Sequence, residues 1–196
     1  MQKKDLQLSA AATILVALFL IPTLINTGLF GKLPFSPILL FLIIPVLGVS
    51  GLFVASLIGK KIPLFWQFGK FAAVGFLNTA IDFGILNFLI AVTGISKGVG
   101  IIPMNAASFS IALVNSFFWN KEWVFPGRKQ ANFAIFVAVT LIGLSINSGI
   151  VYVLTTYVSP VFVESDKLWA NLAKVLATAV SLFWNFAGYK LVVFKR

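Results

Sequence analysis

The sequence contains no cysteine and no histidine, and only five of its 196 residues are acidic. Without cysteine there can be no disulfide and no thiolate nucleophile. Without histidine as well, most zinc sites and imidazole acid–base catalysis are excluded. No carboxylate pair, Walker A motif or other glycine-rich phosphate loop is present. We therefore expect no metal site, no cofactor and no enzymatic activity, ATP hydrolysis included.

Charge of either sign is scarce, and apolar residues are abundant. Charged residues make up 10% of the chain and hydrophobic residues 60%, with a mean hydropathy of +1.02. A soluble domain would carry about 25% charged residues. No polar stretch is long enough to form a soluble catalytic domain of ~100–150 residues. The composition predicts an all-α, polytopic membrane protein.

Six apolar stretches are long enough to cross a hydrocarbon core of ~30 Å as helices. They cover residues 8–31, 38–58, 66–92, 101–119, 131–158 and 168–189, with residues 120–130 expected as a charged loop. A signal peptide is the alternative for the first stretch, but its apolar core would be only about 7–15 residues long. We divide the chain into a leading hairpin (1–58), interpreted as a scaffold or assembly surface, and a four-helix domain (66–196).

The net charge of +10 comes from basic residues in short segments between the apolar stretches. This placement is typical of topology signals that face anionic headgroups, so we expect no nucleic-acid partner. Eleven basic residues fall on one side of the membrane in the six-helix arrangement: Lys3, Lys4, Lys60, Lys61, Lys70, Lys121, Arg128, Lys129, Lys190, Lys195 and Arg196. Only Lys32, Lys97 and Lys167 fall on the other. The bias predicts that both termini are cytoplasmic.

The last four predicted helices resemble a duplicated hairpin. At an offset of 65 residues, Phe68, Phe71, Ala73, Val74, Ile81 and Gly84 align with Phe133, Phe136, Ala138, Val139, Ile146 and Gly149. The closing halves share Lys-x-x-Val-Phe at an offset of 69, while Ser-x-Phe-Trp-Asn repeats at 65, and the sequence leaves both registers open. Each repeat enters from the same side, which predicts a parallel repeat about an axis along the membrane normal.

Residues 71–82, FAAVGFLNTAID, carry the most unusual polar residues of the chain. Gly75, Asn78 and Asp82 fall within about 60° on one helix face. Asp82 is the only acidic residue between Asp5 and Glu122, and a carboxylate in an apolar segment is costly enough to indicate a role or a partner.

The other repeat helices also carry polar faces. The aligned fifth helix has Thr140, Gly143 and Asn147, the sixth has Lys174, Thr178, Ser181 and Asn185, and the fourth has Asn105, Ser108, Asn115 and Ser116. One interpretation is interhelical hydrogen bonding, worth about 0.6 kcal/mol per bond. Because the stripes recur on four helices, we favour a hydrophilic path. Lys174 could extend outward to the interface or pair with Asp82.

Three lysines, Lys70, Lys121 and Lys190, each occupy the predicted cytoplasmic end of a helix, next to aromatic residues. A positive-inside belt with aromatic anchors is one interpretation. The other is a phosphate cradle at headgroup depth, favoured because a lysine recurs in both Lys-x-x-Val-Phe elements.

Residues 66–196 resemble the GtrA-like family. The resemblance rests on Phe68-Gly69-Lys70-Phe71-x-x-Val74-Gly75-x-x-Asn78-Thr79-x-x-Asp82, together with Asn120-Lys121-Glu122-Trp123-Val124-Phe125 and Tyr189-Lys190-x-x-Val193-Phe194. It implies that the chain flips polyprenyl-phosphate-linked monosaccharides across the cytoplasmic membrane for glycosyltransferases that decorate surface polysaccharides or teichoic acids.

The resemblance places Asn78, Asp82, Lys121 and Lys190 on positions characteristic of the family. Combined with the polar faces and the lysines at the helix ends, it leads us to expect a sugar path and a phosphate site. The expected path residues are Asn78, Asp82, Asn147, Lys174, Ser181 and Asn185, and the expected headgroup residues are Lys70, Asn120, Lys121 and Lys190. Two alternatives are a membrane partner that recruits or stabilises a glycosyltransferase, and a small proton-coupled exporter that uses Asp82. The small enclosure of four to six helices favours a homodimer, with Gly48 and Gly51 as candidate contacts.

Overall fold

The computed structural model describes residues 1–95, 99–127, 131–158 and 166–195. Within these ranges the chain is helical, with six α-helices in the order α1 to α6, no strands, and a π-helical turn after α4 and after α6. Two compact units are formed, Met1–Pro126 and Gly127–Arg196. The first holds α1 to α4 and the second α5 and α6.

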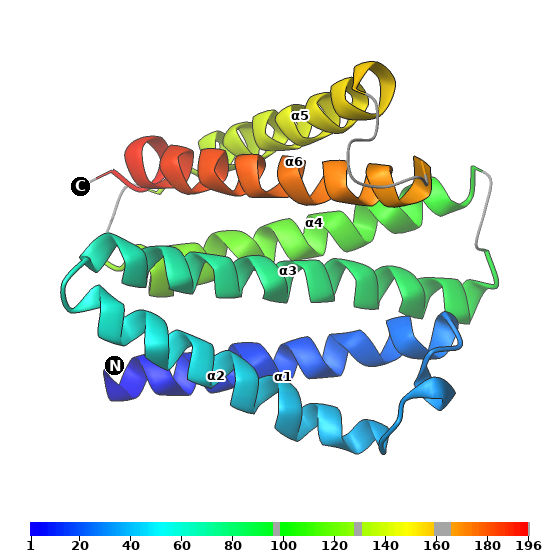
Figure 1. Ribbon diagram of the computed structural model, residues 1–196, viewed down its shortest axis with the longest axis horizontal. Coiled ribbons are helices and arrows are strands. Elements are labelled where there is room, and N and C mark those ends of the chain that lie inside the picture. Colours follow the sequence, from blue (N-terminus) through cyan, green and yellow to red (C-terminus); the bar gives the residue numbers. More distant parts are fainter. Residues whose placement is uncertain (96–98, 128–130, 159–165, 196) are drawn as a thin grey trace. The chain divides into compact units, whose positions relative to one another are not determined.

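In the first unit the leading hairpin packs against the third helix, which in turn packs against the fourth. Helix α1 (Lys3–Asn26) contacts both α2 (Leu40–Gly59) and α3 (Pro63–Thr93), and α3 also contacts α4 (Ile101–Trp119). Figure 1 shows α2 diverging from α3 as it runs away from the loop that joins them. The leading hairpin therefore forms part of the same packed unit as α3 and α4.

The limits of α3 follow from its terminal residues. Pro63 occupies the first turn, where its missing N–H costs nothing, and Gly94 ends the helix with a left-handed φ of 71°. The Gly94 N–H donates to the carbonyl of Ile90 at 2.8 Å, which satisfies one of the last carbonyls of the helix.

The second unit is an antiparallel pair of helices, α5 (Phe133–Tyr157) and α6 (Asp166–Gly188). Asn132 caps α5 by accepting a hydrogen bond from the Ile135 N–H at 3.2 Å. The helices approach closely at Gly188, where an added Cβ would overlap the side chain of Val139. In α6 the Trp184 indole N–H donates to the Val139 carbonyl at 3.1 Å.

Both repeats end in the same π-helical turn, η3 (Asn120–Val124) and η4 (Tyr189–Val193). The N–H of Phe125 donates to the Asn120 carbonyl, and the N–H of Phe194 donates to the Tyr189 carbonyl. The offset of 69 residues is therefore the structural register of the closing elements. The expectation of a loop starting at residue 120 is wrong, because the turn continues the helix and buries Val124 and Phe125.

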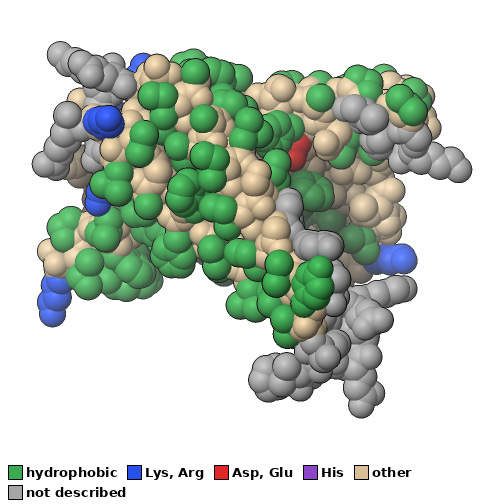
Figure 2. All heavy atoms as spheres, turned by 90° about the horizontal axis from the view of Figure 1, so that it is seen from above, with side chains coloured by type: hydrophobic (Ala, Val, Ile, Leu, Met, Phe, Trp, Pro, Cys, Tyr) green, Lys and Arg blue, Asp and Glu red, His purple; other side chains and the backbone are tan. Residues whose placement is uncertain are grey.

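Apolar side chains cover much of the surface. Phe76, Leu47 and Phe88 are among the most exposed, and Figure 2 shows hydrophobic side chains over most of one face with Lys and Arg at its edges. Four described segments are long and apolar enough to cross a membrane: Lys3–Asn26, Pro37–Gly59, Pro63–Thr93 and Leu176–Val193. A shorter apolar helix covers Phe133–Asn147. The chain is an all-α, polytopic membrane protein, and a crossing by each of the six helices stays a prediction.

Gly84 allows α1 to approach α3 closely, because a Cβ at this position would overlap the Phe19 carbonyl. We expect Gly84→Ala to lower the free energy of unfolding by about 1–3 kcal/mol, the usual cost of overpacking. The matched control is Gly51→Ala in α2, where an added Cβ meets nothing within 4 Å. Alanine should stabilise that helix by about 0.5–1 kcal/mol. Thermal unfolding in detergent compares the two alanine variants. Equal stability of Gly84→Ala and Gly51→Ala would contradict the packing assigned to Gly84.

Candidate functional site: a basic pocket and the polar pairs of α3 and α4

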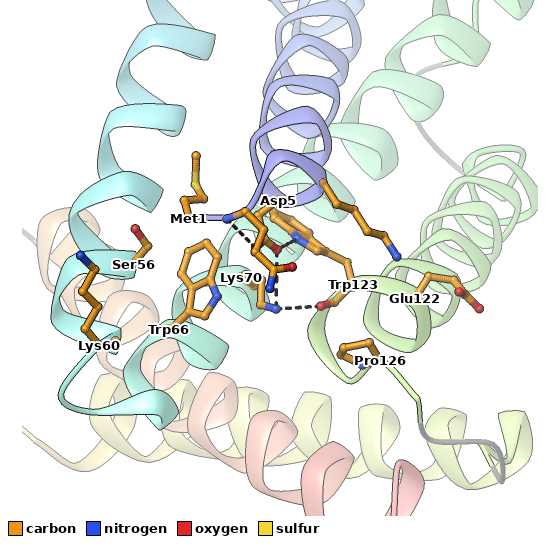
Figure 3. Close-up of a pocket in the computed structure, with 12 residues that line it drawn as sticks. Met1, Asp5, Ser56, Lys60, Trp66, Lys70, Glu122, Trp123 and Pro126 are labelled. Atoms are coloured by element: carbon orange, nitrogen blue, oxygen red, sulfur yellow. Dashed lines mark hydrogen bonds and ion pairs between the residues drawn. The ribbon is translucent and has the colours of Figure 1, made fainter.

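A buried lysine of α3 organises one end of the first unit. Lys70 is 8% exposed, and its Nζ donates to the carbonyl of Trp123 in η3 at 2.9 Å. The same Nζ lies 3.9 Å from Oδ1 of Asp5, in the first turn of α1. That carboxylate oxygen also accepts the Trp123 indole N–H at 3.0 Å. Figure 3 shows these three side chains converging from three helical elements.

The π-helical turn explains why α3 needs a lysine here. The last carbonyls of a helix have no partner within the helix, and they carry the negative end of its dipole. Lys70 donates a hydrogen bond to the Trp123 carbonyl, and Gln67 donates to the Val124 carbonyl at 3.0 Å. Two side chains one turn apart on α3 thus complete the end of the α4–η3 segment.

These contacts form one wall of an open pocket of about 590 Å³. Its lining residues are Met1, Gln2, Lys4, Asp5, Ser56, Gly59, Lys60, Trp66, Lys70, Glu122, Trp123 and Pro126. Three lysines and two carboxylates thus share the lining, and one of those carboxylates is engaged by Lys70. The Trp66 ring lies 5.3 Å from the Lys70 Nζ, which is within cation–π range. The pocket offers ammonium groups beside an aromatic face, a chemistry suited to an anion.

Further along the same helices, two polar pairs join α3 to α4. The Asn115 amide donates to Oδ1 of Asn78 at 2.8 Å, and the Ser108 hydroxyl donates to Oδ1 of Asp82 at 2.7 Å. Ser108 is fully buried, whereas Asn78 and Asp82 are half-buried. Lys70, Asn78 and Asp82 lie within about 120° on α3, over roughly 18 Å of helix rise. The described contacts therefore extend from the pocket as a line of polar groups.

The second unit repeats this pattern in neutral form. Asn147, the residue aligned with Asp82, donates to the hydroxyls of Thr178 and Ser181, at 3.4 Å each. Asn185 faces Gly143, where an added Cβ would overlap its amide, and its Oδ1 is buried without a partner. In each hairpin the polar position of the first helix thus bonds to a hydroxyl on the second.

The predicted phosphate residues are distributed over both units. Lys70 lies in the pocket, whereas Lys121 is half-exposed on η3 and is not part of the lining. Asn120 is buried, and its amide donates to Ser116, leaving Oδ1 unpaired. Lys190 belongs to the second unit, with Nζ 5.9 Å from the Phe186 ring.

The side chain of Lys174 lies outside the described residues, so its predicted pairing with Asp82 stays a prediction. The hydrogen-bond partner that the structure gives Asp82 is Ser108.

Sequence reasoning missed Asp5 and the partner role of Trp123. The one feature of the sequence that could have indicated a role for Asp5 is its position as an acidic residue directly after Lys3 and Lys4. Ser108 and Asn115 were visible as part of the polar face of α4, but their pairing with α3 was not. The leading hairpin was interpreted as scaffold, yet it supplies the carboxylate that faces Lys70.

The fold and these contacts define a polytopic membrane protein built on a duplicated helical hairpin. A family model described as "GtrA/DPMS, transmembrane domain" matches residues 70–194, and the chain belongs to this family. The family is linked to the flipping of lipid-linked sugars. A Bacillus subtilis (strain 168) protein described as "Uncharacterized membrane protein YngA" is 29% identical over 126 residues, covering 64% of this chain and 78% of that relative. No solved structure matches the chain.

The Asp5–Lys70 pair predicts a specific stability loss. Asp5→Asn keeps an oxygen for the Trp123 indole but leaves the buried ammonium without its counter-charge. We expect the free energy of unfolding to fall by about 3 kcal/mol, because removing one partner of a buried ion pair strands the other. Thermal unfolding in detergent measures the loss, and Glu122→Gln, an exposed carboxylate on the same pocket, is the control. A loss no larger than that of Glu122→Gln would contradict the pairing.

Proposed function

We propose that this protein flips a polyprenyl-phosphate-linked monosaccharide across the cytoplasmic membrane, supplying glycosyltransferases that modify surface polysaccharides or teichoic acids. The observation that carries the proposal is the continuity of charge and polarity on α3. Lys70 lies in a pocket lined by three lysines, and the Asn78–Asn115 and Asp82–Ser108 pairs follow it along the same two helices.

The chemistry of such a substrate suits this arrangement. A lysine ammonium binds phosphate as a point charge, and Lys4 and Lys60 line the pocket together with Lys70. Each sugar hydroxyl left unpaired in an apolar medium would cost roughly 2–7 kcal/mol. Amide and carboxylate groups along α3 and α4 can exchange their mutual hydrogen bonds for bonds to those hydroxyls, while the polyprenyl chain stays in hydrocarbon.

The direction of transport follows from charge. We orient the pocket toward the cytoplasm, with both termini on that side, because the basic residues are concentrated in the corresponding segments. A negative-inside potential then favours outward movement of one net negative charge by about 2.3 kcal/mol per 100 mV. Consumption of the sugar outside removes the product, so transport in this direction proceeds without ATP.

The experiment that tests the proposal is reconstitution into liposomes with a fluorescent or radiolabelled polyprenyl-phosphate sugar. We expect the protein to accelerate its movement between leaflets relative to empty liposomes. We expect Asp82→Asn to slow this movement about tenfold, since a hydrogen bond to a charged group exceeds a neutral one by about 1.4 kcal/mol. Thr79→Ala is the matched control, because the exposed Thr79 hydroxyl donates only to its own helix, at the Gly75 carbonyl.

Other outcomes would favour other functions. Transport that collapses with the proton gradient, and with Asp82→Asn, would indicate a proton-coupled exporter. A protein that copurifies with a glycosyltransferase, moves no lipid-linked sugar and tolerates Asp82→Asn would be a recruiting partner. No acceleration for any lipid-linked sugar tried would overturn the proposal.

A further inference from the structure

A second cavity of about 570 Å³ lies between α1, α2 and α3, and its lining is almost wholly apolar. The lining residues are Ala12, Thr13, Val16, Ile44, Leu47, Gly48, Gly51, Leu52, Ala55, Gly69, Ala72, Ala73 and Phe76. The one polar side chain among them, Thr13, donates its hydroxyl to the carbonyls of Ser9 and Ala10 in its own helix. The groove therefore presents no unpaired side-chain donor, and its volume is in the range of ligand sites.

Small residues create this groove where α2 diverges from α3 (Figure 1). It is narrow at Gly69, where an added Cβ would lie 3.0 Å from that of Ala55. It is also closed at Gly48, where a Cβ would overlap Thr13 of α1. At Gly51, between these two points, a Cβ would meet nothing within 4 Å. The open space of the groove thus lies next to Gly51, whereas the space next to Gly48 is filled by the Thr13 side chain of α1.

The groove adjoins the basic pocket along two of the three helices that line it, α2 and α3. Ala55 lines the groove and the next residue, Ser56, lines the pocket. In the same way Gly69 lines the groove and Lys70 lines the pocket. One molecule with an anionic head and a hydrocarbon chain can therefore occupy both cavities, with its charge among the lysines and its chain along α2 and α3.

We propose that the groove between α1, α2 and α3 binds the isoprenoid chain of a lipid phosphate whose phosphate lies in the basic pocket. This inference rests on the proposed function for the identity of the lipid. A single groove accommodates one chain, which favours an isoprenoid phosphate over a two-chain glycerophospholipid. Most of the groove comes from residues outside the family match at 70–194, so the leading hairpin adds the chain-binding part of the site.

Gly51→Leu tests the groove, because the larger side chain enters open space and leucine favours a helix over glycine. The control is Gly149→Leu in α5, another helical glycine with nothing within 4 Å of an added Cβ. Full-length protein in liposomes is exposed to a polyprenyl phosphate carrying a diazirine in its chain, irradiated, digested and mapped by mass spectrometry. We expect labels within residues 44–55 and 69–76, reduced about tenfold in Gly51→Leu and unchanged in Gly149→Leu.

Competition identifies what the groove recognises. Unlabelled polyprenyl phosphate should displace the probe, whereas phosphatidylglycerol and inorganic phosphate at equal concentration should not. Equal labelling of the two leucine variants, or equal displacement by phosphatidylglycerol, would overturn the inference and indicate ordinary surrounding lipid. Crosslinks between two copies of the chain through residues 44–55 would also overturn it, because a second copy would then fill the groove.

Transport measured in the same liposomes separates this inference from the proposed function. If wild-type protein moves lipid-linked sugar but carries no labels in the groove, the result supports the flippase function and overturns the chain-binding groove. If the groove is labelled but no sugar moves, the result supports the chain-binding groove and overturns the flippase function.

Discussion

The contact of Lys70 with Asp5 and the Trp123 carbonyl is the constraint on which the first unit depends. An ammonium group in an otherwise apolar helix is expensive unless a counter-charge and hydrogen-bond acceptors surround it. Asp5 comes from α1 and Trp123 from η3, so the partners that Lys70 needs connect the leading hairpin to the turn that follows α4. The basic pocket lies at this junction because Lys70 and its partners meet there. Lys4 and Lys60, which also line the pocket, add to its positive charge.

The two hairpins show how one duplicated architecture can complete the same turn in two ways. In the first unit Lys70 and Gln67 bond to the last carbonyls of η3. In the second the residue aligned with Lys70 is Ile135, and the turn is held by aromatic packing: Phe136 stacks on Tyr189 with ring centroids 4.3 Å apart, and the Tyr189 hydroxyl bonds to Thr140. The first turn is thus completed by charged and amide side chains and the second by aromatic packing, and this difference places the candidate site in the first unit.

The pocket, the polar pairs and the small-residue groove all include α3. One face of α3 carries Lys70, Asn78 and Asp82. Elsewhere on the same helix, the small residues Gly69, Ala72 and Ala73 line the apolar groove beside α2. A lipid-linked sugar has three chemically distinct parts, a phosphate, a ring of hydroxyls and a hydrocarbon chain. Each has a matching environment along this helix, which is why the proposed substrate and the proposed chain groove can be tested on the same molecule.

Composition and periodicity alone determined the membrane class, the helical repeat and the polar residues of α3. Apolar stretches with few charges have one stable form in lipid, so the predicted 66–92 agrees with Pro63–Thr93 to within three residues. The choice between the 65- and 69-residue registers needed the π-helical turns, whose i→i+5 bonds no residue pattern marks. The partners of Lys70, Asn78 and Asp82 were decided only by tertiary structure. Asp5 is 118 residues from Trp123 and Asn115 is 37 from Asn78, and a face pattern says which side of a helix is polar but not which distant helix packs against it.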